Sequence, residues 1–185
     1  MKRLIFVLCL FLVWMNLSAQ SSNSPLRMEI SFIFNRQGGS SSNQYAVWIE
    51  DNQGNLVKTL FATKFTAGGG WEKRPQSIPL WVQKSGLSRL DKKDVDAFTG
   101  ATPRTGVQKY TWDALDKNGN PVAEGEYNVF LEATLRAENK VVYSSSFVLE
   151  NGHDDGPYVA ETKVTYFGSS TGERKMIESV KVLFQ

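Results

Sequence analysis

At 185 residues and 41% hydrophobic content, the chain is long enough to bury a core without covalent staples. Its formal net charge is only +2, and no basic stretch carries the interleaved aromatic residues typical of nucleic-acid binding, so we expect no nucleic-acid partner. A single cysteine excludes an internal disulfide framework, and a single histidine excludes a histidine-rich metal site.

Residues 1–19 have the layout of a secretory signal peptide. Lys2 and Arg3 precede an apolar run that ends at Leu17, and small residues follow it up to Ala19. The run is too short and wrongly flanked for a spanning helix, so we expect cleavage after Ala19 and an exported, periplasmic protein without a direct membrane span. Cys9 lies inside the run and is a poor site for lipid attachment, so the processed chain has no cysteine.

Residues 20–26 form a polar lead-in, and residues 27–185 are expected to fold as one domain. Apolar and polar residues alternate with the period of a β-strand over most of this length. Clusters rich in glycine and asparagine separate the alternating segments. We expect about eight strands, at 27–34, 44–51, 56–65, 107–113, 126–138, 140–150, 158–167 and 176–184.

The alternation also assigns the faces of the strands. The predicted inward-facing sets are Met28, Ile30, Phe32 and Phe34; Tyr45, Val47 and Ile49; and Tyr127, Val129, Leu131, Ala133 and Leu135. Trp48 faces away from its set, and so do Asn128, Glu132 and Thr134. This pattern is typical of half-buried antiparallel strands.

Residues 66–106 interrupt the alternation and contain Trp71, Trp81 and three prolines. A stretch of this length inside a compact domain is usually functional or contains short elements of its own, and we allow a short strand near 78–82 and a helical turn near 87–91. The predicted fold class is all-β: an immunoglobulin-like antiparallel β-sandwich with a long irregular insertion, at about 66–106, before a hairpin that starts at Trp112 and Asp113.

Two turns, at 51–55 and 116–120, share an order of acid, amide, glycine and asparagine. Their glycines can take a positive φ, and their aspartates can accept bonds from backbone amides further along the chain. Oxygen-rich turns also bind calcium, but both lack the later bidentate glutamate of a full calcium loop. We therefore interpret them as tight turns.

The segments VWIEDNQGNLVKTL and YTWDALDKNGNPVAEGEYNVFLEA resemble the immunoglobulin-like domain of flagellar hook-assembly scaffold proteins. The matching positions are Asp51, Gly54, Val57, Trp112, Asp113, Asp116, Gly119, Val122, Gly125 and Tyr127. These segments, combined with the signal peptide and the loop at 99–103, resemble a bacterial family of predicted periplasmic proteins, domain of unknown function 2271. The resemblance covers roughly residues 27–150. The resemblance implies a sandwich in which Trp112 and Tyr127 pack as aromatic anchors, but sandwiches host many unrelated functions.

Residues 96–102, DAFTGAT, are similar at every position to the acceptor motif of exported flavoproteins, Asp-x-x-Ser/Thr-Gly-Ala-Ser/Thr. In those proteins a flavin transferase attaches FMN to the final hydroxyl. The resemblance implies that Thr102 carries FMN through a phosphoester, with Asp96, Thr99, Gly100 and Ala101 completing the site. The same residue types are ordinary in a turn, so a plain loop remains the alternative.

The residue types suit this chemistry. Phosphoryl transfer depends on positioning and charge stabilisation, so the acceptor hydroxyl must enter the transferase's metal site. Gly100 and Ala101 have little or no side chain and so let the backbone enter a narrow site. Pro103 biases Thr102 toward an extended conformation. Asp96 would bind the transferase's metal or orient the segment, and Arg104 would neutralise the phosphate. The candidates for stacking on the flavin ring are Phe98, Trp71, Trp81 and Trp112, each of which a core or tethering role also explains.

Two functions follow as hypotheses. The first is a periplasmic electron-transfer protein, a flavin carrier rather than a stand-alone enzyme, whose partners are an extracytoplasmic flavin transferase and a membrane redox protein. The second is a non-catalytic immunoglobulin-like binding or scaffold module for another envelope protein, without a cofactor. A hydrolase ranks below both, because His153-Asp154-Asp155 is typical of a turn and no nucleophile motif accompanies it. We assign no catalytic and no metal-binding residue.

Overall fold

The computed structural model describes residues 27–38, 42–136, 139–150, 158–168 and 176–184. The predicted signal peptide at 1–19, the polar lead-in at 20–26 and His153 lie outside the described residues. Within the described ranges, no helix is long and apolar enough to cross a membrane.

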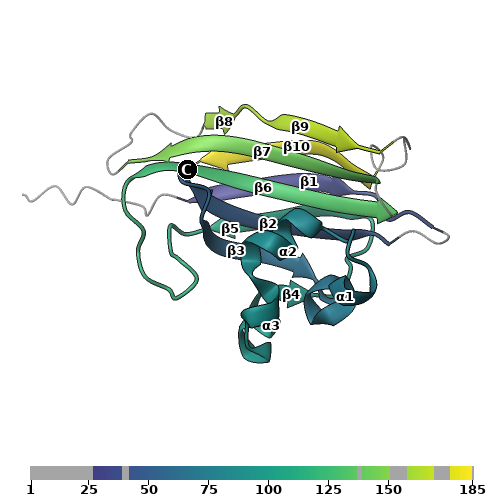
Figure 1. Ribbon diagram of the computed structural model, residues 1–185. Helices are drawn as coiled ribbons and strands as arrows, with labels where there is room; N and C mark the ends of the chain where they lie inside the picture. Colours follow the sequence, from purple (N-terminus) through teal and green to yellow (C-terminus); the bar gives the residue numbers. More distant parts are fainter. Residues whose placement is uncertain (1–26, 39–41, 137–138, 151–157, 169–175, 185) are drawn as a thin grey trace, which may run out of the picture.

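Two sheets form the body of the molecule and lie one over the other as a β-sandwich (Figure 1). The four-stranded sheet has the order β5 (Gly106–Trp112), β1 (Met28–Phe34), β10 (Ile177–Phe184), β8 (Tyr158–Ala160). The six-stranded sheet has the order β4 (Thr99–Gly100), β3 (Leu56–Thr63), β2 (Gln44–Asp51), β6 (Gly125–Arg136), β7 (Asn139–Leu149), β9 (Lys163–Phe167). Neighbouring strands are antiparallel except β3 and β4. The predicted mainly-β sandwich is confirmed.

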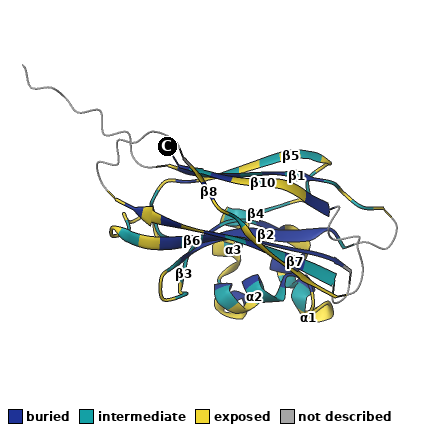
Figure 2. Cartoon of the chain, turned by 90° about the horizontal axis from the view of Figure 1, so that it is seen from above, coloured by how far each residue is buried: buried dark blue, intermediate teal, exposed yellow. Residues whose placement is uncertain are grey.

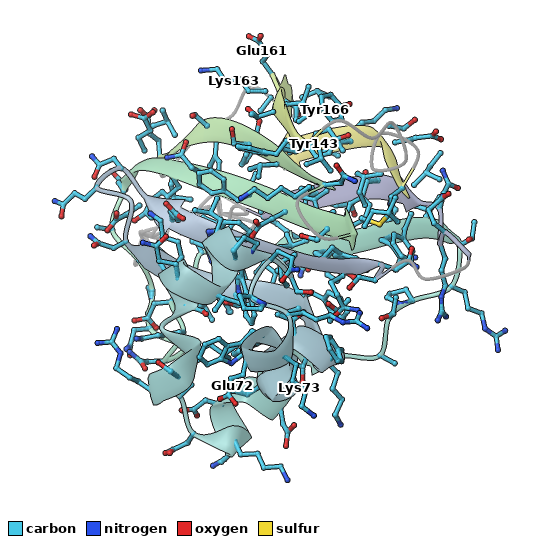
Figure 3. All side chains as sticks on the ribbon, turned by 45° about the vertical axis from the view of Figure 1, so that its right-hand side comes forward. Glu72, Lys73, Tyr143, Glu161, Lys163 and Tyr166 are labelled. Carbon is cyan, nitrogen blue, oxygen red and sulfur yellow. The ribbon has the colours of Figure 1, made fainter. Side chains whose placement is uncertain are left out.

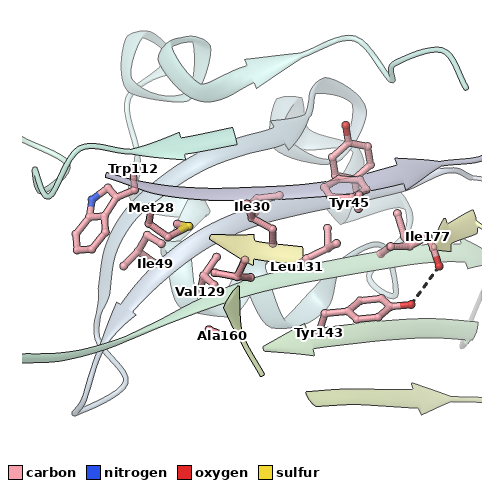
Figure 4. Packing of buried hydrophobic residues seen from close by; sticks show 14 of the residues in the cluster. Met28, Ile30, Tyr45, Ile49, Trp112, Val129, Leu131, Tyr143, Ala160 and Ile177 are labelled. Carbon is pink, nitrogen blue, oxygen red and sulfur yellow. Dashed lines mark hydrogen bonds between the residues drawn. The ribbon is translucent and has the colours of Figure 1, made fainter. Parts of the chain in front are cut away.

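The core between the sheets follows the predicted faces. All three predicted inward-facing sets are buried in one cluster, together with Trp112 (Figure 4). Tyr143 enters the same core from β7 and donates a hydrogen bond from its hydroxyl to the carbonyl of Ile177, 3.1 Å away. Trp48 faces the other side of the sheet, as predicted, but it is also buried.

The insertion is a folded helical layer, which the sequence did not predict. Its elements are η1 (Thr66–Gly70), α1 (Trp71–Lys73), α2 (Pro79–Ser85), η2 (Leu87–Arg89) and α3 (Lys92–Phe98). They cover the outer face of the six-stranded sheet on its β2–β3 side (Figures 1 and 2). A second apolar cluster fills the interface: Ala46, Trp48, Ala62, Ala67, Ile78, Trp81 and Leu87.

Two local predictions in the insertion have opposite outcomes. The short strand near 78–82 is wrong, because Pro79 begins α2 after Ile78 turns the chain with a left-handed φ of 43°. Proline suits a first helical turn, since its φ is fixed and it lacks an amide that would go unpaired there. The helical turn near 87–91 is confirmed by η2.

Three further expectations are corrected by the topology. The predicted hairpin after Trp112 closes only as an isolated antiparallel bridge between Leu115 and Pro121, because β5 and β6 belong to different sheets. Residues 158–167 split into β8 and β9, which also lie in different sheets. The polar face of β6 is not half-buried: Glu132 and Thr134 are fully covered by the helical layer.

Candidate functional site

The acceptor-like motif at 96–102 is folded along the edge of the six-stranded sheet rather than free. Asp96 lies on α3, Thr99 and Gly100 form β4, and Ala101 and Thr102 begin the connection to β5. Asp96 and Ala101 are exposed, whereas Thr99, Gly100 and Thr102 are half-buried. The motif therefore spans a helix, a strand and a loop, which corrects the expectation of an irregular segment.

Gly100 allows β4 to dock on β3. The two strands pair in parallel, with Ala62 beside Thr99 and Thr63 beside Gly100. A Cβ at Gly100 would lie 2.7 Å from Cε2 of Phe61, so glycine lets the backbone approach that ring. Phe61 is itself stacked on Tyr110, with ring centroids 5.1 Å apart. The glycine of the motif thus has a structural reason that sequence alone did not provide.

The helix that carries Asp96 is held by few contacts. None of the residues of α3 is buried, and Asp91 at its N-terminus makes no side-chain capping bond. Phe98 meets the Trp81 ring edge to face, with centroids 5.9 Å apart, and Val95 packs against the second apolar cluster. Such a segment belongs to the least stable part of a fold and opens more readily than the core.

Two hollows flank α3. The first, of about 560 Å³, is lined by Lys64, Ala67, Gly68, Gly69, Trp71, Glu72, Leu87, Ser88, Leu90, Lys92, Val95, Asp96 and Thr99. The second, of about 360 Å³, is lined by Leu56, Lys58, Thr59, Ser85, Leu90, Asp94, Ala97, Phe98, Lys117 and Asn118. Two of the five predicted site residues, Asp96 and Thr99, meet at the first hollow, while Gly100, Ala101 and Thr102 lie just beyond its lining.

The structure separates the four predicted stacking candidates. Trp112 is buried between the sheets, and Trp81 is buried under the helical layer, where its indole nitrogen donates to the Thr59 hydroxyl at 3.1 Å. Phe98 packs on Trp81 and lines the second hollow. Trp71 is half-buried and lines the first hollow. Only Trp71 combines an accessible indole with the hollow that Asp96 and Thr99 share.

Glu132 is an important residue that the sequence analysis placed on a half-exposed face. Its carboxylate accepts hydrogen bonds from the backbone amides of Leu80 and Trp81, at 3.2 and 2.9 Å, and its Oε1 lies 4.0 Å from the Lys140 ammonium. Burial raises the pKa of Glu132 to about 7, although these amides and Lys140 act in the opposite direction. Glu132 thereby fastens the start of α2 to β6. In the sequence, Glu132 is one of three polar residues on the same strand face, with Asn128 and Thr134, and its role follows only from the helical layer that covers it.

The two oxygen-rich turns behave as tight turns. In the second, Oδ1 of Asp116 accepts hydrogen bonds from the amides of Asn118 and Asn120, both at 2.8 Å, and Gly119 has a φ of 83°. The bond from the Asn120 amide, followed by that from Asn118, holds the pKa of Asp116 below its usual value. The first turn repeats this pattern around Asp51. Among the described residues, no cluster of acids and histidines could hold a metal ion.

Comparison with known proteins gives one match. A family model described as "Predicted periplasmic protein (DUF2271)" matches residues 26–165, which is most of the chain and includes β1 to β8, the helical layer and the motif at 96–102, but not β10. Neither the curated proteins nor the solved structures gave a match.

Proposed function

We propose, for a chain that belongs to the DUF2271 family of predicted periplasmic proteins, that it is an electron-transfer protein carrying FMN on Thr102. The observation that carries the proposal is the complete motif from Asp96 to Thr102, lying beside a hollow of about 560 Å³. Pockets of this size hold small ligands and cofactors. The partners would be an extracytoplasmic flavin transferase and a membrane redox protein.

Attachment would proceed as a balanced phosphoryl transfer. The Thr102 hydroxyl oxygen attacks the FMN phosphorus of a flavin dinucleotide, the pyrophosphate bond breaks, and the nucleoside monophosphate leaves with the bridging oxygen. The hydroxyl proton passes to a base of the transferase. Asp96, Thr99, Gly100 and Ala101 would present the acceptor, because this chemistry depends on positioning.

The fit to FMN can be tested against residues of this chain. The first hollow offers an accessible indole and apolar side chains for a flat aromatic ring, and charged side chains at its margin. When bound, the flavin supplies reversible uptake of electrons. The chain would bind and orient it, and its weakly held α3 would let Thr102 reach a second enzyme.

The deciding experiment is mass spectrometry of the protein exported in a host that also expresses the flavin transferase. We expect an FMN adduct on the peptide that contains Thr102. The variant Thr102→Ala should lose the adduct completely, since no oxygen remains to form the ester. The matched control Thr105→Ala should keep it, because the Thr105 hydroxyl has a structural partner, the amide of Arg36 at 3.0 Å. An unmodified wild-type chain beside a labelled known acceptor would overturn the proposal.

The second candidate is a non-catalytic immunoglobulin-like binding or scaffold module. Two contacts favour an immunoglobulin-like sandwich. The Tyr127 hydroxyl donates to the carbonyl of Ala123 at 2.7 Å, as in a tyrosine corner, and the Trp112 and Tyr127 rings pack with centroids 5.2 Å apart. The outer face of the four-stranded sheet also exposes Val107 and Val159. A chain that stays unmodified while it co-purifies with an envelope protein would favour this function.

A further inference from the structure

We infer that the first hollow beside α3 is the seat of the flavin ring, and that Trp71, Glu72 and Lys92 set the ring's fluorescence and reduction potential. The inference rests on the proposed function and specifies where the attached group lies. It concerns residues outside the acceptor motif.

The walls of this hollow come from three separate segments. Residues 64–72 contribute the first wall, α3 with Thr99 contributes the second, and Leu87 to Leu90 contribute the third. The first wall is held in place from below, because the Thr66 hydroxyl, itself buried, donates to Oε1 of Gln44 at 3.1 Å. The hollow is therefore preformed on one side and bounded by the weakly held α3 on the other.

Thr102 lies close enough to the first hollow along the chain for a flavin attached to it to place its ring there. Thr99 lines the hollow, and Thr102 follows three residues later, so their backbones lie at most about 10 Å apart. The ribityl chain and phosphate of FMN extend over a comparable length. A ring attached at Thr102 can consequently fold back into the hollow without moving the sheet.

The lining matches the two ends of an isoalloxazine. Leu87, Leu90 and Val95 offer an apolar surface for its dimethylbenzene end, and Trp71 offers a flat indole for stacking. At Gly68 and Gly69 a Cβ would meet nothing within 4 Å, so the backbone there borders open space. Bare backbone amides and carbonyls can approach the polar pyrimidine end closely.

Charged side chains line the hollow, so the reduction potential of the flavin reports whether its ring lies there. The reduced ring, after uptake of two electrons and one proton from a reductant, is an anion. A nearby ammonium stabilises this anion and a nearby carboxylate destabilises it. Lys64 and Lys92 provide the ammonium groups, whereas Glu72 and Asp96 provide the carboxylates. Glu72 lies on the helical side of the molecule, away from Tyr166 (Figure 3).

The second hollow supplies the matched control. It is smaller, lies on the other side of α3 and has no tryptophan in its lining. Ser88→Leu would place an apolar side chain in the first hollow from η2, and Ala97→Leu would place the same side chain in the second from α3. Ser88 and Ala97 are both exposed, so neither change disturbs a core.

The test uses the full-length protein with FMN attached, and begins with mass spectrometry of each variant. A missing adduct in the wild type overturns the proposed function itself. With the adduct present, we expect Trp71→Ala and Ser88→Leu to brighten the flavin fluorescence, because the quenching stack on Trp71 is lost, and Ala97→Leu to leave it unchanged. Glu72→Gln should raise the midpoint potential, measured by redox titration, and Lys92→Gln should lower it.

Two outcomes would overturn the inference while leaving the attachment intact. If Trp71→Ala leaves the flavin fluorescence unchanged, and Ala97→Leu alters it while Ser88→Leu does not, the ring lies in the second hollow. If the attached flavin responds to none of the changes, the ring lies in solvent, where exposed charges beyond about 8 Å are screened at physiological ionic strength.

Discussion

Single residues decide how the motif at 96–102 is attached to the fold. Gly100 has a structural reason that does not depend on the resemblance to the acceptor motif, because the Phe61 ring occupies the space that a side chain would need. Glu132 is a second residue whose role depends on its surroundings in the fold. Its buried carboxylate binds the backbone amides of Leu80 and Trp81 and so attaches α2 to β6. Both residues give predictions that do not depend on the proposed cofactor.

Gly100→Ala should destabilise the protein by about 1–3 kcal/mol, because the new methyl group overlaps the Phe61 ring and overpacking has costs of this size. Urea unfolding would measure the change. Gly38→Ala is the control, since a Cβ at Gly38 meets nothing within 4 Å and its φ is not positive. It should shift the free energy of unfolding by less than about 0.5 kcal/mol. Equal effects of the two changes would contradict the close contact.

Glu132 should make stability depend on pH. Its pKa is about 7 in the folded protein and 4.5 as the ordinary value, so the folded state holds the proton more tightly. Its stabilising contribution is therefore complete below about pH 4.5 and is lost as the pH rises through about 7, by up to about 3 kcal/mol. Unfolding by urea at a series of pH values would measure this. The difference between wild type and Glu132→Gln should slope downward across that window, and a flat difference would contradict it.

At the scale of elements, the motif is distributed over α3, β4 and the following loop. A flavin transferase must receive the acceptor hydroxyl in its own active site. The pairing of β4 with β3 restrains that movement, and the sparse contacts of α3 permit it. Attachment should therefore require this edge of the sheet to open.

A disulfide across β3 and β4 would test the opening. Ala62 and Thr99 are direct neighbours, and adjacent strands are about 4.8 Å apart, which lies within the range of disulfide geometry. The predicted processed chain has no other cysteine. In Ala62→Cys/Thr99→Cys, attachment measured by mass spectrometry should fail in the oxidised form and recover after reduction. Equal modification of both forms would show that β4 stays paired during transfer.

At the scale of the whole molecule, the six-stranded sheet packs against an apolar core on each of its two faces. The inner face of the six-stranded sheet packs on the four-stranded sheet, and its outer face packs on the helical layer. On this outer face the rings of Trp48 and Phe130 stack with centroids 5.2 Å apart, and Trp48 shares its apolar cluster with Trp81 of α2. The insertion is consequently part of the stable fold and not an appendage.

Trp81→Ala should destabilise the whole protein by about 3–5 kcal/mol, because it empties the centre of the second core. Circular dichroism and tryptophan fluorescence should report one coincident urea transition. Trp71→Ala should have a smaller effect, since Trp71 is only half-buried. Two separate transitions for Trp81→Ala would show that the helical layer unfolds independently of the sandwich.

The sequence by itself determined most of the strands and the inward faces of β1, β2 and β6, because a period of two is a local property of the chain. It also determined the two aspartate turns and the motif at 96–102. Only the tertiary structure decided that residues 66–98 form a helical layer, that Glu132 is buried, and that Asp96 and Thr99 share a hollow with Trp71. Short helices have no long periodicity to detect, and burial on a second face depends on residues distant in sequence, so neither could be derived from local pattern.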